Sequence, residues 1–198
     1  MKTRRSIGVF DINAPVIIGM ALLSLLLVGV NALTGNLATR FLAAYYTSWA
    51  DPLMYLRLFS YVLVHADFSH YFGNYMLMLV VGPIVEERYG AKRLLLMMLV
   101  TALVTALFNL LFFRNIMLVG ASGLVFMLIL VSAYTNLRQG KFPITVVLVA
   151  VLYIGNEVVT GLGANDNISR LSHIVGALCG AGFGFALNRG AIRGGGQG

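Results

Sequence analysis

A chain of 198 residues that is 59% hydrophobic and only 11% charged, with a mean hydropathy of +0.87, has too few polar side chains to cover a water-soluble globule. Its 14 Lys and Arg against 7 Asp and Glu would suggest nucleic acid in a soluble protein, but here basic loops facing an anionic membrane surface explain the excess. The single cysteine excludes a disulfide framework and a thiolate metal site. We therefore expect an all-α polytopic membrane protein that binds no nucleic acid.

The apolar stretches predict six membrane-spanning helices. We place them at residues 15–33, 68–85, 94–113, 119–136, 143–159 and 171–188, within one membrane domain of residues 15–188. Residues 1–14 form a short basic N-terminus and residues 189–198 a flexible basic Gly-rich tail. We expect the first stretch to be retained, because no small-residue cleavage signal follows it. Residues 34–67 mix aromatic residues with isolated charges, which is typical of the membrane interface.

The basic residues predict the orientation, since six spans place both termini on one side. The terminal side holds Lys2, Arg4, Arg5, Arg88, Lys92, Arg93, Arg138, Lys141, Arg189 and Arg193, and the other side holds Arg40, Arg57, Arg114 and Arg170. Basic residues accumulate on the cytoplasmic side of membrane proteins. We therefore expect a multi-pass membrane protein with both termini in the cytoplasm. The membrane in which we place it is the bacterial inner membrane.

A serine between small residues opens the fourth stretch, in the order Gly120-Ala121-Ser122-Gly123. A hydroxyl flanked by glycines can be approached by a bulky reactant, which suits a nucleophile. Small residues in membrane helices more often permit close packing of another helix, and a serine there often bonds its own backbone. The motif alone leaves both interpretations open.

All three histidines lie toward the predicted outer ends of the spans: His65 and His70 at the second, and His173 at the sixth. Ionisable side chains at membrane depth are costly, so they indicate packing partners, pathways or chemistry. His70 and Asn74 are four residues apart and share a helix face. Interhelical hydrogen bonding is one explanation, and a zinc site is another. Because no carboxylate accompanies the imidazoles, we expect no metal and no other cofactor.

Glycines at 176, 180 and 184 form a stripe on the sixth stretch, one turn after His173. Such a stripe lets a neighbouring helix approach almost to backbone contact. If that neighbour is the fourth stretch, packed through Gly123, the imidazole and the Ser122 hydroxyl can meet. A histidine base would then activate a hydroxyl that is a poor nucleophile at neutral pH.

Five motifs follow one another along the chain. They are Arg57, His65-x4-His70-x3-Asn74, Glu86-x-Arg88-x-Gly90, Gly120-x-Ser122-Gly123 and His173-x2-Gly176-x3-Gly180. Together they resemble the rhomboid family of intramembrane serine proteases, and the similarity extends from about residue 56 to residue 184. The resemblance implies a bundle of six transmembrane helices.

The resemblance also implies a mechanism, in which His173 takes the proton of Ser122 and Ser122 attacks a peptide carbonyl, without the buried aspartate of soluble triads. The Ser122 N–H and the side chains of His65 and Asn74 would hold the oxyanion, and His70 would support them. The other motif positions are expected to be structural: Gly120 and Gly123 at the oxyanion pocket, Gly176 and Gly180 in helix packing, and Arg57, Glu86 and Arg88 in the fold.

By the same resemblance, substrates are single-span membrane proteins in the lipid bilayer, cut after a small residue near the outer end of their helix. A helix hides its carbonyls in hydrogen bonds, so it must unwind before attack. The fifth stretch and residues 160–169 are expected to form the gate through which it enters.

Three residues depart from the family pattern. Phe126 replaces a tyrosine expected to stack on the base, Leu56 replaces a tryptophan before Arg57, and Ser172 replaces an alanine before His173. None of them removes a reacting group. Two other functions stay open: a rhomboid-like protein that binds membrane helices without cutting them, and a small transporter or channel with the His/Asn cluster in its polar pathway.

Overall fold

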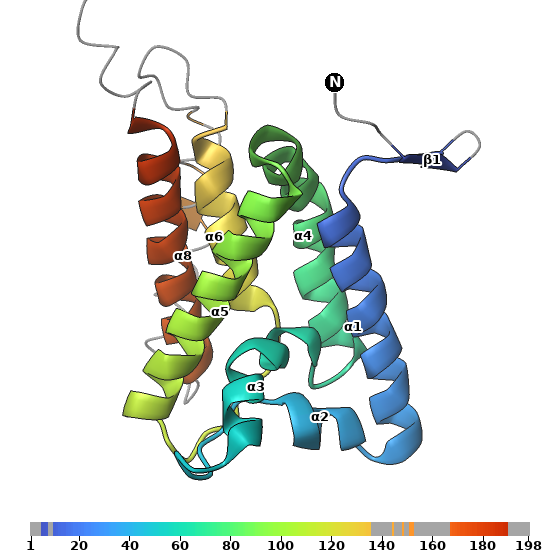
Figure 1. Ribbon diagram of the computed structural model, residues 1–198, viewed down its shortest axis with the longest axis vertical. Coiled ribbons are helices and arrows are strands. Elements are labelled where there is room, and N and C mark those ends of the chain that lie inside the picture. Colours follow the sequence, from blue (N-terminus) through green and yellow to red (C-terminus); the bar gives the residue numbers. More distant parts are fainter. Residues whose placement is uncertain are drawn as a thin grey trace, which may run out of the picture.

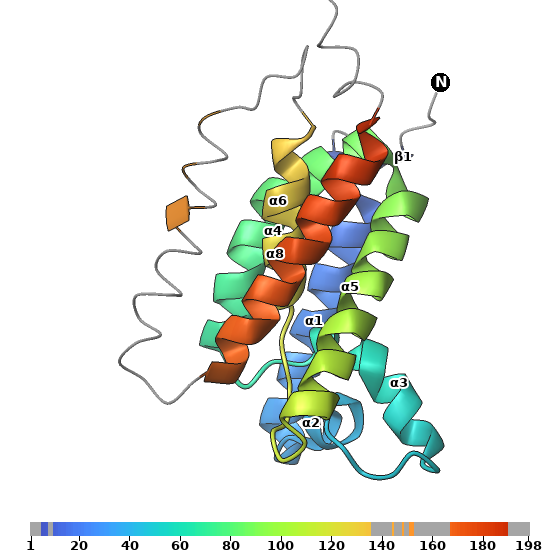
Figure 2. The ribbon, with the colours of Figure 1, turned by 90° about the vertical axis from the view of Figure 1, so that its left-hand side faces the viewer.

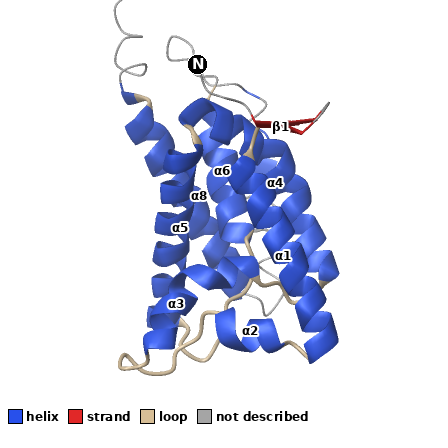
Figure 3. Cartoon of the chain, turned by 45° about the vertical axis from the view of Figure 1, so that its right-hand side comes forward, coloured by secondary structure: helices blue, strands red, loops and turns tan. Residues whose placement is uncertain are grey.

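The protein is a bundle of helices, seen in a computed structural model that describes residues 10–135 and 167–189 together with residues 5–7, 144, 148 and 151–152 (Figure 1). The helices are α1 (Pro15–Thr34), α2 (Leu37–Leu42), α3 (Pro52–Ser60), η1 (Tyr61–Leu63), α4 (Phe68–Tyr89), α5 (Ala91–Phe112), α6 (Ser122–Ala133) and α8 (Asn167–Leu187). This confirms the all-α class. A small antiparallel hairpin of β1 (Arg5–Ile7) and β2 (Phe10–Ile12), which the sequence did not predict, precedes α1 (Figure 3).

Three helices are long and apolar enough to cross a membrane, namely α1, α4 and α5, and they coincide with the first three predicted spans. The fourth and sixth predicted spans coincide with shorter apolar helices, α6 and residues Leu171–Leu187 of α8. Most of the fifth predicted span, residues 143–159, and residues 160–166 of the predicted gate lie outside the described residues. The total of six spans therefore stays a prediction.

Helix α6 begins at Ser122, three residues later than the predicted start of the fourth span. Gly120 has φ +103°, a conformation that only glycine adopts readily, so the helix cannot extend back through it. The 12 residues of α6 cover about 18 Å, less than the thickness of a bilayer core. The chain before Ser122 therefore enters the bundle without helical structure, and α6 starts part-way along it (Figure 1).

The two ends of the bundle differ in construction. The short helices α2 and α3 close the end opposite the described N-terminal segment, where α1 ends and α4 begins (Figure 1). The buried Arg57 of α3 donates from Nε to the carbonyl of Phe41 (3.2 Å) and from Nη2 to that of Arg40 (3.4 Å), and the Ser60 hydroxyl donates to the carbonyl of Leu42 (2.8 Å). Helix α3 thus satisfies the last carbonyls of α2, which have no partner within their own helix.

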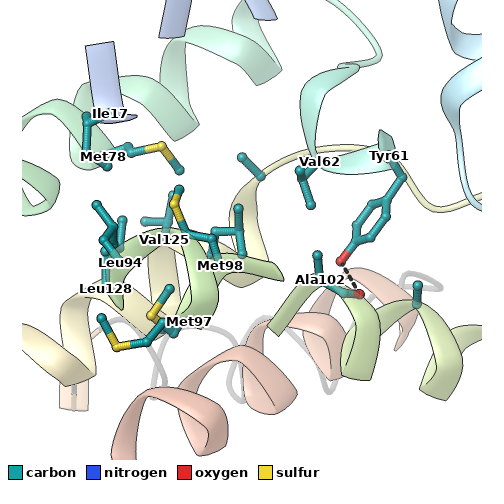
Figure 4. Close-up of a cluster of buried hydrophobic side chains, with 14 of the residues drawn as sticks. Ile17, Tyr61, Val62, Met78, Leu94, Met97, Met98, Ala102, Val125 and Leu128 are labelled. Carbon is teal, nitrogen blue, oxygen red and sulfur yellow. Dashed lines mark hydrogen bonds between the residues drawn. The ribbon is translucent and has the colours of Figure 1, made fainter. Parts of the chain in front are cut away.

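A buried apolar cluster joins α1, α4, α5 and α6 (Figure 4). Its members include Ile17, Met78, Leu94, Met97, Met98, Val125 and Leu128. Methionine side chains adapt to irregular gaps between helices that cross at different angles. Tyr61 closes one side of this core, and its hydroxyl donates to the carbonyl of Ala102 (3.3 Å). The opposite faces of the helices carry exposed leucines and valines, as a lipid-facing surface requires.

At the other end, Glu86 of α4 caps the first turn of α1. Its carboxylate accepts the N–H groups of Val16 (3.0 Å) and Ile17 (3.1 Å), and the side chain is 3% exposed. The residue preceding this helix, Ala14, has no side-chain oxygen that could do so. Glu86 therefore satisfies two N–H groups that the helix leaves free and places a negative charge at the positive end of its dipole.

We expect Glu86→Ala to lower the free energy of unfolding by about 2 kcal/mol, because it leaves two buried N–H groups without an acceptor. Chemical unfolding of the purified protein in detergent micelles measures this change. Glu87→Ala is the matched control, since Glu87 is the exposed neighbour on the same helix and its loss should cost less than about 0.5 kcal/mol. Equal losses in the two variants would contradict the capping role of Glu86.

Candidate active site

The segment that leads to Ser122 is fastened along its length. Ala44 and Leu118 exchange two backbone hydrogen bonds (2.8 and 3.0 Å), and the Gly120 N–H donates to the carbonyl of Tyr61 (3.1 Å). The side chain of Asn109 donates to the carbonyl of Ile116 (3.0 Å). The segment is thus tied both to the interfacial connection and to α5, which determines where α6 begins.

His65 holds the turn that precedes Ser122. The N–H of Ala121 donates to His65 Nε2 (3.3 Å), and the imidazole is 1% exposed, with the rings of Tyr71 and Tyr75 at 5.8 and 5.7 Å between centroids. Burial, and secondarily the neighbouring His70, lowers the pKa of His65 to about 4. The ring is therefore neutral at physiological pH, and Nε2 has a lone pair with which to accept the Ala121 N–H.

His70 and Asn74 meet at Gly120. Asp67 caps α4 by accepting the N–H of His70 (2.8 Å), which fixes the first turn of the helix. A Cβ atom at Gly120 would lie 2.7 Å from Nε2 of His70 and 3.7 Å from Nδ2 of Asn74. Asn74 Nδ2 also donates to the carbonyl of His70 (3.0 Å), so one of its two N–H bonds is used and the other is left for a ligand. Only glycine leaves room for both side chains here.

Helices α6 and α8 lie side by side in backbone contact (Figure 2). A Cβ atom at Gly176 would collide with the backbone of Gly123, and one at Gly180 would collide with the backbone of Met127. Neither collision could be relieved by moving a flexible side chain. The glycine stripe of α8 thus faces α6, and Gly123 is part of the contact.

His173 lies on the face of α8 that packs on α6. Its imidazole stacks on the ring of Phe126, with centroids 4.5 Å apart and an interplanar angle of 12°, and the side chain is 8% exposed. Phe126 is four residues after Ser122, so the two side chains share one face of α6. The ring of Phe126, which the sequence predicts to stack on the base, therefore contacts His173 one helical turn from Ser122. Ser122 itself is partly exposed.

The remaining motif residues are dispersed. Arg57 and Glu86 make the helix-capping contacts described above, and Arg88 is exposed in the last turn of α4. Among the residues that depart from the family pattern, Leu56 is 52% exposed. The carbonyl oxygen of Ser172 is the atom nearest to where a Cβ at Gly123 would lie. Within the described part of the chain, no group of three His, Cys, Asp or Glu side chains is placed to hold a metal ion.

Most of the residues that fasten the loop before Ser122 could not be recognised from the sequence. Ala44 and Leu118 act through their backbone, as does the Tyr61 carbonyl, and backbone pairing between distant segments has no signature in side-chain type. Asn109 is the one member with a recognisable feature, since it is an amide in an otherwise apolar span.

Comparison with known proteins relates most of the chain to one family. The family model described as the Rhomboid domain matches residues 52–190. The chain is 30% identical over 140 residues to "Rhomboid-related protein 1" of Caenorhabditis elegans and 30% identical over 143 residues to "Rhomboid-related protein 2" of Mus musculus. It is 29% identical over 134 residues to "RHOMBOID-like protein 4" of Arabidopsis thaliana.

These alignments cover 66% of this chain in each case, and 39%, 47% and 34% of the three relatives, so the chain spans less than half the length of the curated proteins that it matches. The family match includes the whole segment from α3 to α8 and therefore every candidate site residue named above. The chain belongs to the Rhomboid domain family and is an integral membrane protein of all-α fold.

Proposed function

We propose that this chain is an intramembrane serine endopeptidase in which Ser122 is the nucleophile and His173 the general base. The observation that supports this most directly is the stacking of the His173 imidazole on Phe126, one turn from Ser122 on the same face of α6. The Phe126 ring contacts the flat face of the imidazole and so orients the base beside the helix that carries Ser122. An aromatic surface thus replaces the aspartate that orients the histidine in soluble triads.

In the proposed reaction, the imidazole of His173 accepts the hydroxyl proton while Ser122 Oγ forms a bond to the carbonyl carbon of the substrate. The tetrahedral intermediate collapses when the C–N bond breaks and the imidazolium gives its proton to the leaving amine. Water, deprotonated by the same imidazole, then hydrolyses the acyl-enzyme. Each step uses groups of this chain and water alone.

We assign the oxyanion pocket to His70, Asn74 and the backbone N–H groups of the first turn of α6. The first N–H groups of a helix have no acceptor within it, so those around Ser122 are available to a developing negative charge. The sequence-based prediction named the Ser122 N–H and the side chains of His65 and Asn74 as the donors, and gave His70 a supporting role. The contacts at Gly120 favour an exchange of the two histidine roles. The imidazole of His70 faces the space beside Gly120, whereas His65 Nε2 already accepts the Ala121 N–H. His65 is then a positioning residue.

The proposed substrates are membrane proteins that present a transmembrane helix with a small residue at the cleavage site. Ser122 lies at the start of a short helix inside the bundle, so a substrate has to reach it from within the membrane and with its carbonyls freed from helical hydrogen bonds. The fifth span and residues 160–169 remain the proposed gate. The proposed orientation places both termini in the cytoplasm and the serine nearer the outer surface.

We expect Ser122→Ala and His173→Ala to reduce cleavage of a model transmembrane substrate in detergent by about 10³-fold or more, and Ser122→Ala to abolish labelling by a fluorophosphonate. Ser132→Ala is the control, because Ser132 lies on α6 but donates to the carbonyl of Ile129 (2.7 Å). Activity should be unchanged in EDTA. Labelling of Ser122→Ala at the wild-type rate would contradict the assignment, and a wild-type protein that neither cleaves nor labels would support the non-catalytic alternative.

Substitution of His70 should affect catalysis, whereas substitution of His65 should affect stability. We expect His70→Ala and Asn74→Ala to lower kcat about 10²-fold with little change in KM, because a donor to the oxyanion acts in the transition state. His65→Ala should instead lower the melting temperature, since it leaves the buried Ala121 N–H without an acceptor. Steady-state kinetics and thermal unfolding of the three variants measure both effects. A larger loss of kcat in His65→Ala than in His70→Ala, at unchanged melting temperature, would restore the original assignment.

A further inference from the structure

A pocket of about 450 Å³ lies between the segment that follows α2 and the segment that follows α5, and none of the candidate catalytic side chains lines it. It is lined by Arg40, Tyr45, Tyr46, Arg114, Asn115 and Met117. Pairing of Ala44 with Leu118 brings the segments after α2 and after α5 together and thereby forms its walls. Its volume falls within the range of about 300–1,000 Å³ that is usual for ligand sites.

The pocket is strongly electropositive. Two guanidinium groups line it, and among its described lining residues there is no carboxylate. The nearby Arg57 is different, since it is buried and its Nη1 lies 3.5 Å from a carboxylate oxygen of Asp51. Two like charges that share a pocket repel each other unless an anion lies between them. The chemistry of the pocket therefore suits an anionic ligand.

Neither arginine is needed by its own surroundings. Arg40 is in the last turn of α2, where a cation could serve the helix end, but the carbonyls of Arg40, Phe41 and Leu42 already accept from Arg57 and Ser60. The guanidinium of Arg114 lies over the ring of Tyr46, 4.9 Å from its centroid. A guanidinium stacked in this way keeps its in-plane N–H donors free, and the donors of Arg114 and Arg40 together match the oxygens of a phosphate.

The apolar surface beside the pocket indicates which phosphate compound fits. The membrane-crossing helix α5 ends at Phe112, two residues before Arg114, and its last side chains Leu111 and Phe112 are 58% and 66% exposed. Met117, in the pocket wall, is 51% exposed. The charged pocket thus begins where a lipid-facing helix surface ends, at the level of phospholipid headgroups.

We propose that this pocket binds the phosphate of an anionic phospholipid, with Arg40 and Arg114 on the phosphate and the acyl chains along the end of α5. The segment after α5 that lines the pocket continues into the fastened loop before Ser122, so a bound lipid would add to the contacts that hold this loop. The proposal does not depend on catalysis by Ser122.

Native mass spectrometry of the full chain in detergent micelles, titrated with phosphatidylglycerol, tests this. We expect wild type to retain the lipid, and Arg40→Gln/Arg114→Gln to bind it roughly tenfold more weakly, because charge-assisted hydrogen bonds to phosphate are lost. The matched control is Lys92→Gln/Arg93→Gln, which makes the same change in net charge with exposed residues at the start of α5, the opposite end of that helix. The control should bind as wild type does.

Two results would overturn the proposal. Binding of phosphatidylglycerol by the Arg40→Gln/Arg114→Gln variant at the wild-type affinity would show that the pocket is not the lipid site. Equal affinity of the wild type for glycerol phosphate, the headgroup without acyl chains, would assign the pocket to a soluble phosphate compound. If the double variant has a lower melting temperature than wild type in the absence of lipid, the single variant Arg40→Gln replaces it in the titration. Its substitution should leave α2 stable, since the Arg40 hydrogen bonds that stabilise this helix involve main-chain atoms.

Discussion

The candidate site depends on the backbone contact between α6 and α8. Gly176 lies against Gly123, and Gly180 against Met127, at distances that no side chain would permit. A membrane offers little hydrophobic force to hold two helices together, so close packing of small residues has to provide the attraction. The same closeness brings His173 onto the ring of Phe126 and so onto the helix face that carries Ser122. Packing and proposed chemistry therefore share one set of residues.

The second requirement is that the serine be held still although it lies at the end of an extended segment. Backbone hydrogen bonds with Ala44 and Tyr61, and one with the imidazole of His65, anchor residues 118, 120 and 121. Those anchors belong to the interfacial connection, which is itself held by Arg57 and Ser60 on the last carbonyls of α2. Residues far from the serine can thus affect its position through a continuous series of contacts. The pocket lined by Arg40 and Arg114 lies beside this series of contacts, with Tyr45 and Met117 also in its wall.

Much of this was predictable from sequence because membrane helices show themselves by length and composition. The first three spans were located to within a few residues, and the glycine stripe with His173 indicated a helix partner. The sequence could not predict features that depend on the main chain and not on side chains. The later start of α6 follows from the backbone angle of Gly120, and the pairing of Ala44 with Leu118 uses only main-chain atoms. The relative depth of His65 and His70 likewise required the fold, since both are equally polar in the sequence.

The most direct test of the account is to increase the distance between α6 and α8. Gly176→Leu would place a side chain where the backbone of Gly123 lies, whereas Gly182→Leu, on the same helix, adds one where nothing is within 4 Å. The measurement is the rate of fluorophosphonate labelling of Ser122 in both variants, with helix content checked by circular dichroism. We expect Gly176→Leu to label about 10²-fold more slowly and Gly182→Leu to match wild type, because displacement of the base by about an ångström is enough to lose its effect. Labelling of a folded Gly176→Leu variant at the wild-type rate would contradict the account.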